Sequence, residues 1–214
     1  MSLRGWMVLG LIAGAIGWWF SPASPRAAPV PAHASGATVD CRQPPRVHAG
    51  ALPLQSDVPG SLSPFRLQAA TLTPLAGFSI DARVLSREDY RAGREADLSP
   101  TDLALGWGRM RDDDVLSQLD ISQGGRFYSY RWQNEPPLPP AEIVRSSANM
   151  HLIPANAAAA EALQDVRKDD RVRIDGWLVE AKAPDGWYWR SSTTREDSGA
   201  GACEVIYVCS IERL

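Results

Sequence analysis

The pattern of hydrophobic and polar positions changes twice along this chain. An uncharged apolar run occupies residues 5–20, and the stretch that follows shows no sustained helical or strand period. Short alternating and helical patterns begin near residue 65. Alternation with period two indicates half-buried strands, and apolar positions three or four apart indicate amphipathic helices. We therefore divide the chain into a hydrophobic segment (1–22), a linker (23–64) and one folded domain (65–214).

The apolar run at residues 5–20 follows a short basic start and ends with Trp18, Trp19 and Phe20. As a helix it would be about 24 Å long, slightly short of a hydrocarbon core of about 30 Å, and neighbouring residues can extend it. Tryptophans at one end are typical of an interfacial anchor. We expect a single-span signal-anchor in a bacterial inner membrane, with the domain in the periplasm. The alternative is a signal peptide that is cleaved, which leaves a secreted periplasmic protein.

Three cysteines bear on the domain and its linker. Residues 23–64 are rich in Pro, Ala, Gly and Ser, which predicts an extended tether, and Cys41 lies within it. Cys203 and Cys209 are six residues apart in the last predicted strand, a span of about 20 Å that prevents a bond between them. Either can pair with Cys41 in an oxidising compartment, and Cys209, near the chain end, is the preferred partner. The alternative is three free thiols.

The patterns in the domain predict both strands and helices. Alternation, turn residues and aromatic content predict strands at residues 78–85, 126–132, 169–180, 187–192 and 203–211. Helices are predicted from Ser99 to the glycine at 106, and at residues 112–119, 141–147 and 157–166. Ser99 and Pro100 fit a helix start, and Asn156 is a good N-cap for the last of these helices.

The order of these elements predicts an α+β fold. A short helix, a polar turn and a strand of the form Val-x-Ile-x-Gly-x-Leu precede a hairpin partner and a closing strand, as in a small antiparallel β-barrel of the OB type. Gly176, in the middle of that strand, suits the bend that a barrel needs. Residues 86–168 would then form a large helical insertion, and the N-terminal hydrophobic helix completes the chain.

Several phrases of the sequence resemble a known group of proteins. Residues 98–108, 120–123, 147–154 and 189–204 are similar to a family of uncharacterised proteobacterial proteins that are membrane-anchored or exported and carry one small β-rich domain. The likeness covers about residues 75–208. It implies a bacterial inner-membrane or periplasmic setting, and the family has no known activity to transfer to this chain.

Composition narrows the classes of ligand. The net charge of −3 argues against a general nucleic-acid binder. Aromatic residues with neighbouring arginines at 171–190 suggest stacking on single strands, but alternation assigns part of that set to the core. The three histidines lack zinc-ligand spacing, and no EF-hand loop follows the acidic run 112–114. We expect no nucleic acid, no metal and no cofactor; the expected partners are the inner membrane, through residues 5–20, and an envelope protein.

One group of residues can be read as a catalytic site. His151 can act as a general base, oriented by Asp102 or Asp120, with Ser191 or Ser192 as the nucleophile. We take His151, Asp102 and Ser192 as the candidate catalytic set. Neither serine lies in a Gly-x-Ser-x-Gly elbow, so a structural histidine is the plainer interpretation.

A second group can be read as a ligand-binding site. Ser191 and Arg195 lead into a glycine-containing loop, where hydroxyls and a guanidinium can hold a carboxylate or phosphate. Trp107, between two glycines, and Trp189 can each present an indole ring. The plainer interpretation is a solvated strand edge and a buried Trp107. We therefore expect a non-enzymatic, membrane-tethered periplasmic binding domain, with a hydrolase that uses His151 as the alternative.

Overall fold

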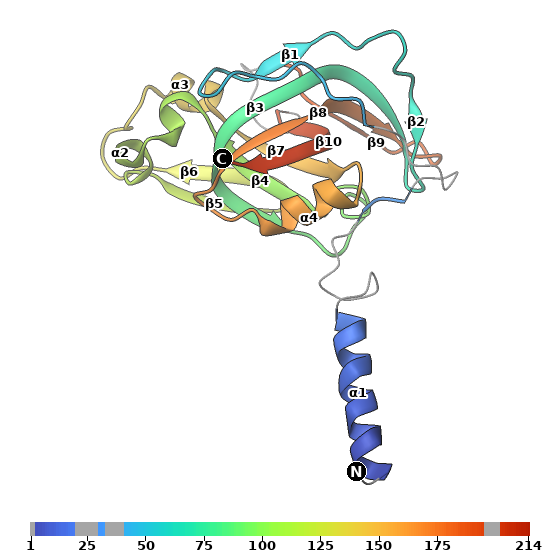
Figure 1. Ribbon diagram of the computed structural model, residues 1–214. Coiled ribbons are helices and arrows are strands. Elements are labelled where there is room, and N and C mark those ends of the chain that lie inside the picture. The colour runs from blue at the N-terminus through green and yellow to red at the C-terminus, as the bar shows by residue number, and fades with distance from the viewer. Residues whose placement is uncertain (1–2, 20–29, 33–40, 195–201) are drawn as a thin grey trace.

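The computed structural model describes residues 3–19, 30–32, 41–194 and 202–214, and it is an α+β protein made mostly of strands with a few short helices (Figure 1). In chain order the elements are α1 (Leu3–Trp19), β1 (Leu54–Ser56), β2 (Phe65–Arg66), β3 (Thr71–Asp89), β4 (Thr101–Gly106), the 3-10 helix η1 (Gly108–Arg111), α2 (Asp113–Leu116), β5 (Asp120–Gly124), β6 (Phe127–Arg131), α3 (Pro140–Arg145), β7 (Ser147–Pro154), α4 (Ala157–Asp165), β8 (Arg171–Lys182), β9 (Tyr188–Arg190) and β10 (Glu204–Arg213).

The N-terminal apolar run forms α1, a helix of 17 residues. Among the described residues, no helix combines the length and the apolar character that a membrane span requires.

The principal sheet is organised around the long strand β3. β3 pairs antiparallel with β4 on one side and with β8 on the other. β4 continues antiparallel to β7, β7 runs parallel to β10, and β10 returns antiparallel to β8. The path of hydrogen-bonded neighbours therefore leads from β3 through β4, β7, β10 and β8 back to β3. Figure 1 shows β3 arching over β8, β10 and β7, and β5 and β6 form a separate hairpin.

The main core lies on one face of these five strands, where alternate residues point inward. Its members share complete or nearly complete burial and come from every strand of the path, including Phe78, Ile80, Leu103, Leu105, Met150, Leu152, Ile174, Leu178, Ile206 and Val208. Helix α4 packs against this core through Leu163 and is followed by the buried Val166. As predicted, Asn156 caps α4, since its side-chain oxygen accepts a hydrogen bond of 2.9 Å from the amide of Ala159.

One glycine allows β8 and β10 to approach closely. A Cβ atom built on Gly176 would lie 2.2 Å from the carbonyl oxygen of Tyr207, beside the irregularity in register between Val208 and Ser210. We expect Gly176→Ala to lower the free energy of unfolding by about 1–3 kcal/mol, because the backbone must shift to admit the methyl group. Urea denaturation measures this, with Gly60→Ala, which adds a methyl group in open space, as the control. Equal midpoints for the two variants would contradict the prediction.

The predicted helix beginning at Ser99 is wrong, because residues 101–106 form β4. This strand pairs with β3 on one side and β7 on the other, and each of its residues is buried. A strand buried on both faces lacks the alternation that marks a half-exposed strand. The remaining local signal was Ser99-Pro100, which is typical of a helix start. The helical insertion predicted at 86–168 is also wrong. Residues 86–168 form β4, β7 and the β5–β6 hairpin, and the helices among them are short.

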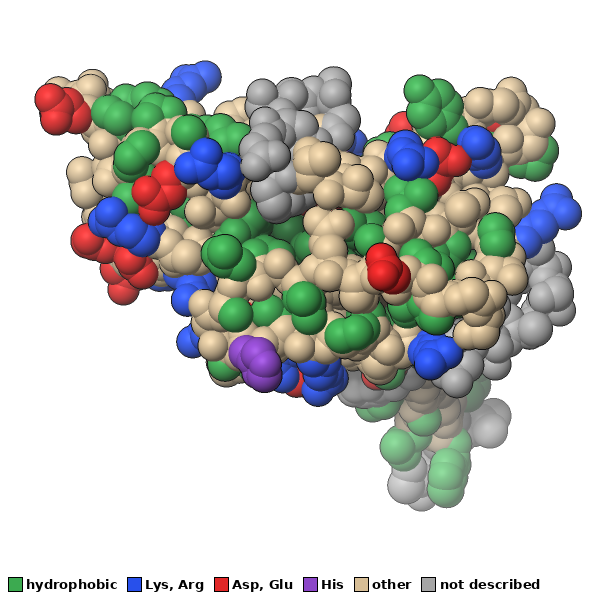
Figure 2. All heavy atoms as spheres, turned by 90° about the horizontal axis from the view of Figure 1, so that it is seen from above, with side chains coloured by type: hydrophobic (Ala, Val, Ile, Leu, Met, Phe, Trp, Pro, Cys, Tyr) green, Lys and Arg blue, Asp and Glu red, His purple; other side chains and the backbone are tan. Residues whose placement is uncertain are grey.

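The predicted linker also differs from the structure. From Cys41 onward its residues lie on the domain: β1 pairs with β3, the amide of Val47 donates to Ser79, and Arg46 forms an ion pair with Asp175. Figure 2, a view from above Figure 1, shows acidic and basic side chains interspersed over this face. The predicted disulfide between Cys41 and Cys209 is confirmed, with Cα atoms 5.2 Å apart. Residues 30–32 contact the domain as well, since the Ala32 carbonyl accepts a hydrogen bond of 2.8 Å from the amide of Gln68.

Candidate functional site

A buried polar cluster lies on the face of β4 and β7 that points away from the main core. The register of the two strands places Asp102 directly opposite His151, and Asn149 follows two residues earlier on the same face of β7. Their chain neighbours Leu103, Met150 and Leu152 point into the core. The side chains of Asp102 and His151 are buried, so their polar atoms need partners within the protein.

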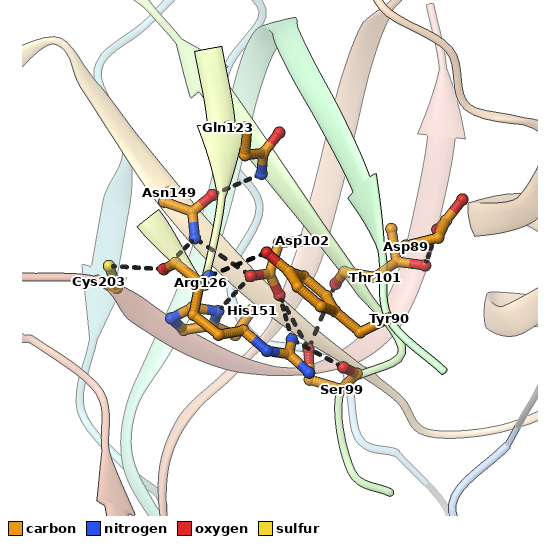
Figure 3. Close-up of polar contacts among 10 residues, drawn as sticks. All are labelled: Asp89, Tyr90, Ser99, Thr101, Asp102, Gln123, Arg126, Asn149, His151 and Cys203. Atoms are coloured by element: carbon orange, nitrogen blue, oxygen red, sulfur yellow. Dashed lines mark hydrogen bonds and ion pairs between the residues drawn. The ribbon is translucent and has the colours of Figure 1, made fainter. Parts of the chain in front are cut away.

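The carboxylate of Asp102 is the centre of this cluster (Figure 3). Its Oδ1 accepts a hydrogen bond of 2.7 Å from Nη1 of Arg126 and a longer one from the Ser99 hydroxyl. Its Oδ2 accepts from the Asn149 amide at 3.3 Å. Nδ1 of His151 lies 3.0 Å from the same oxygen without forming a well-directed hydrogen bond. Two of the predicted catalytic residues, His151 and Asp102, are therefore in contact.

Arg126 reaches this cluster from the turn of the β5–β6 hairpin. Gly125 and Arg126 both have positive φ angles, of 58° and 71°, as the central residues of a type I′ turn do. Such a φ is uncommon for a residue other than glycine. The turn is fixed in place because the Arg126 amide donates to the Tyr90 hydroxyl and its carbonyl accepts from Asn149 at 3.0 Å. The backbone of the turn thus directs the guanidinium toward Asp102.

Further contacts hold the hairpin over β4 and β7. The side-chain amide of Gln123 donates to Asn149 at 2.7 Å, and Tyr128 shares a short hydrogen bond with Ser147. Burial raises the pKa of the Tyr128 phenol well above its usual value, so this group stays protonated. The sulfur of Cys203, which is outside the disulfide, lies 4.0 Å from the Arg126 carbonyl oxygen. The polar cluster is therefore covered by the hairpin rather than open to solvent.

Aromatic rings surround the guanidinium where it approaches the surface. The Arg126 guanidinium carbon lies 3.7 Å from the centroid of the Tyr90 ring and 5.7 Å from that of Trp189. Trp189 in turn packs against His151, with centroids 4.5 Å apart, and against Trp187 at 6.2 Å. We call the partly exposed group Tyr90, Arg126, Trp187 and Trp189 the aromatic–arginine surface. Three segments that are remote in sequence build it.

The backbone engages the hydroxyls of the two predicted serines, and Trp107 is removed from the surface. The Ser192 hydroxyl exchanges hydrogen bonds with the backbone of Thr194, and the Ser191 hydroxyl accepts from Val205. Both serines thus serve the local backbone. Trp107 is buried in the main core, so the interpretation of Trp107 as a ligand-binding ring is wrong. Arg195 lies outside the described residues.

Sequence reasoning missed Arg126, Tyr90 and Asn149 as members of the site. The signal for Arg126 was the Gly124-Gly125 pair before a predicted strand, which marks a tight turn but not where its next side chain points. Asn149 and Tyr90 join the site through strand pairing and loop packing, which one sequence does not specify.

A cavity of about 1260 Å³ is lined in part by Tyr90 and its neighbours in the loop after β3. Its walls include Arg87, Asp89 and Thr101, which are paired with one another: Arg87 contacts Asp89 at 2.8 Å and Thr101 donates to Asp89 at 2.7 Å. These charges are already used to join the loop to the sheet. Among the described residues, no group of three or more His, Cys, Asp or Glu side chains has the arrangement of a metal site.

No protein-family model, curated protein or solved structure matches this chain.

Proposed function

We propose that this chain is a membrane-anchored, exported domain of the OB type that binds a small ligand or an envelope protein through the aromatic–arginine surface. The proposal joins three inferences, about the fold type, the location and the binding face. Each depends on a different observation.

The OB type is supported by the order of strand pairing. Five strands follow one another as β3-β4-β7-β10-β8 and return to β3, with a parallel pair between β7 and β10 and helix α4 between β7 and β8. OB-folds are five-stranded Greek-key barrels whose ligands bind on the second and third strands, between the loops that join strands one to two and four to five. In this chain those strands are β4 and β7, and those loops carry Tyr90 and Trp189.

The exported location is supported by the N-terminus and the disulfide. Residues 5–20 are apolar and uncharged, so their transfer from water into the hydrocarbon core of a membrane is favourable. Disulfides persist in the periplasm and are rare in the cytosol of mesophilic cells. The Cys41–Cys209 bond is therefore what an exported domain would carry, and it joins the segment before β1 to the last strand.

The observation that carries the binding role is the anchoring of Arg126. Its guanidinium is fixed to the fully buried Asp102, and its ring partners come from the loop after β3 and from β9. A buried polar network of this kind stabilises one geometry rather than adding apolar burial. Here that geometry holds a cation and three aromatic rings at the expected ligand face of an OB-fold.

A hydrolase remains the second candidate because His151 and Asp102 are 3.0 Å apart, the arrangement in which a carboxylate orients a general base. The predicted nucleophile does not support a hydrolase, because the Ser192 hydroxyl is hydrogen-bonded to the backbone of Thr194. A non-enzymatic binding role therefore explains more of the observed contacts than a hydrolase does.

A photo-crosslinking residue at position 94 tests the binding face. The Arg94 side chain is exposed and its guanidinium lies 5.5 Å from the centroid of the Trp187 ring, so a benzophenone side chain there would reach a bound partner or ligand. In cells making the full-length protein, we expect an irradiation-dependent adduct in the membrane fraction. Replacement of Trp189 by alanine should reduce its yield at least fivefold.

The matched control places the same crosslinker at the exposed Glu135, in the loop after β6. Equal adducts from positions 135 and 94, or an adduct at 94 that Trp189→Ala leaves unchanged, would contradict a binding role for this surface.

A further inference from the structure

The guanidinium of Arg126 is held from one side only. Its Nη1 donates both to Asp102, at 2.7 Å, and to the carbonyl of Ser99, at 2.9 Å. Neither Nε nor Nη2 donates a hydrogen bond to any residue that the structure describes, and the side chain is 17 % exposed. Arginine carries five N–H donors in a planar fork, so part of this fork remains available at the surface.

The surroundings of Arg126 restrict how it can move. The guanidinium carbon lies 3.7 Å from the centroid of the Tyr90 ring and 5.7 Å from that of the Trp189 ring. Asp102 accepts a hydrogen bond from the inner Nη1. A surface arginine normally loses side-chain entropy when it binds. Folding has already restricted the Arg126 side chain, so little further side-chain entropy is lost when a ligand binds. Such preorganisation favours binding.

We propose that the outward edge of Arg126 binds an oxyanion, a carboxylate or a phosphate group, whose attached planar or apolar part lies on Trp189 and Trp187. This inference rests on the proposed function and names its ligand class. Paired N–H groups of arginine match the two oxygens of a carboxylate or phosphate. The adjoining indoles supply a stacking surface for the uncharged part of the ligand.

The charges around this edge agree with an anionic ligand. The Asp102 charge faces inward and is shared among Arg126, Asn149 and Ser99, so it does not occupy the outer donors. Arg94 adds a second cation over the ring of Trp187, at 5.5 Å, although it is paired with Asp185. A ligand without acceptor oxygens would leave the outer N–H groups of Arg126 with water alone, and a neutral oxygen would accept from them more weakly than an anionic one.

Three small probes of similar shape test the proposal. Benzoate, phenyl phosphate and benzamide present a carboxylate, a phosphate and a neutral amide on one ring. Binding to the full-length protein in detergent is followed by tryptophan fluorescence and by calorimetry. We expect benzoate or phenyl phosphate to bind at least about tenfold more tightly than benzamide, since the fork recognises paired anionic oxygens. The stronger of the two identifies the oxyanion.

Arg126→Lys and Arg126→Gln probe the residue itself. Lysine keeps the cation beside Asp102 but lacks the planar fork, so we expect it to weaken anion binding about tenfold while the protein stays folded. Arg190→Gln, a substitution of an exposed arginine paired with Glu180 on β8, is the control and should leave binding unchanged.

Two results would overturn the inference: benzamide binding as tightly as both anions, or Arg126→Lys binding them as the natural protein does. If the crosslinker at position 94 nevertheless forms its Trp189-dependent adduct, the binding face stands and only the oxyanion is wrong. If both experiments fail, the proposed function is wrong as well.

Discussion

Replacement of Asp102 by alanine is expected to lower the free energy of unfolding by about 3–5 kcal/mol, the usual loss when one partner of a buried charged pair is removed. The substitution removes the charged acceptor of the Arg126 guanidinium, which keeps only the Ser99 carbonyl, and one of the two acceptors of the Asn149 amide, in a site that water scarcely reaches. Because Arg126 is only slightly exposed, solvent can replace little of the lost interaction. Denaturation by guanidinium chloride, followed by tryptophan fluorescence, measures the change.

Asp185→Ala is the matched control for this prediction. Asp185 also pairs with an arginine, Arg94, but at the surface, where water and salt screen the interaction. We expect no measurable change in stability for the control. Asp102→Asn, which keeps an acceptor oxygen and loses the charge, should fall between the two. If Asp102→Ala unfolds at the same denaturant concentration as Asp185→Ala, the buried network does not stabilise the domain, and the anchoring of Arg126 loses its physical basis.

The elements that sequence predicted correctly are those whose signal is local. Residues 78–85 alternate and lie within β3, and Val172 and Ile174 alternate in β8. Helix α4 carried an Asn cap and an apolar stripe within nine residues. In each case the side chains that decide the structure lie within one turn or one strand, so a single chain contains the information.

Strands β4 and β7 were missed because their environment is not local. β4 is buried on both faces, which removes alternation, and Ser99-Pro100 before it matches a helix start. β7 does alternate, but its polar members Asn149 and His151 are buried beneath the β5–β6 hairpin. Polarity on that face reflects a second layer of the protein, which alternation cannot reveal.

The candidate site could be predicted only in part for the same reason. His151 and Asp102 were grouped by chemistry, and the β4–β7 register brings them together. The contribution of Arg126 depends on a turn with two positive φ angles and on how its hairpin packs. The proposed ligand face therefore became visible only when three distant segments were placed in space.

Removal of the Cys41–Cys209 disulfide is expected to lower the free energy of unfolding by about 4–5 kcal/mol. The two cysteines are 168 positions apart, and the chain entropy of the unfolded state rises with the size of the loop that a disulfide closes. The double variant Cys41→Ser/Cys209→Ser tests this by chemical denaturation under non-reducing conditions. Cys203→Ser, which replaces the cysteine outside this disulfide, is the control and should keep the disulfide and nearly all of the stability.

The same bond also has a local consequence, because it is one of several contacts that hold residues 41–47 on the sheet. Without it, the Trp177 indole still donates to the carbonyl of Arg42 at 2.9 Å, and the amide of Val47 still donates to Ser79. We therefore expect the double variant to fold. Exchange of the β3 and β8 amides should speed up with the fall in global stability, and the amide of Val47 should exchange faster still, because it can also open locally. Equal free energies of exchange at Val47 and in β3 and β8 would instead show that residues 41–47 open only with the whole domain and have no separate stability.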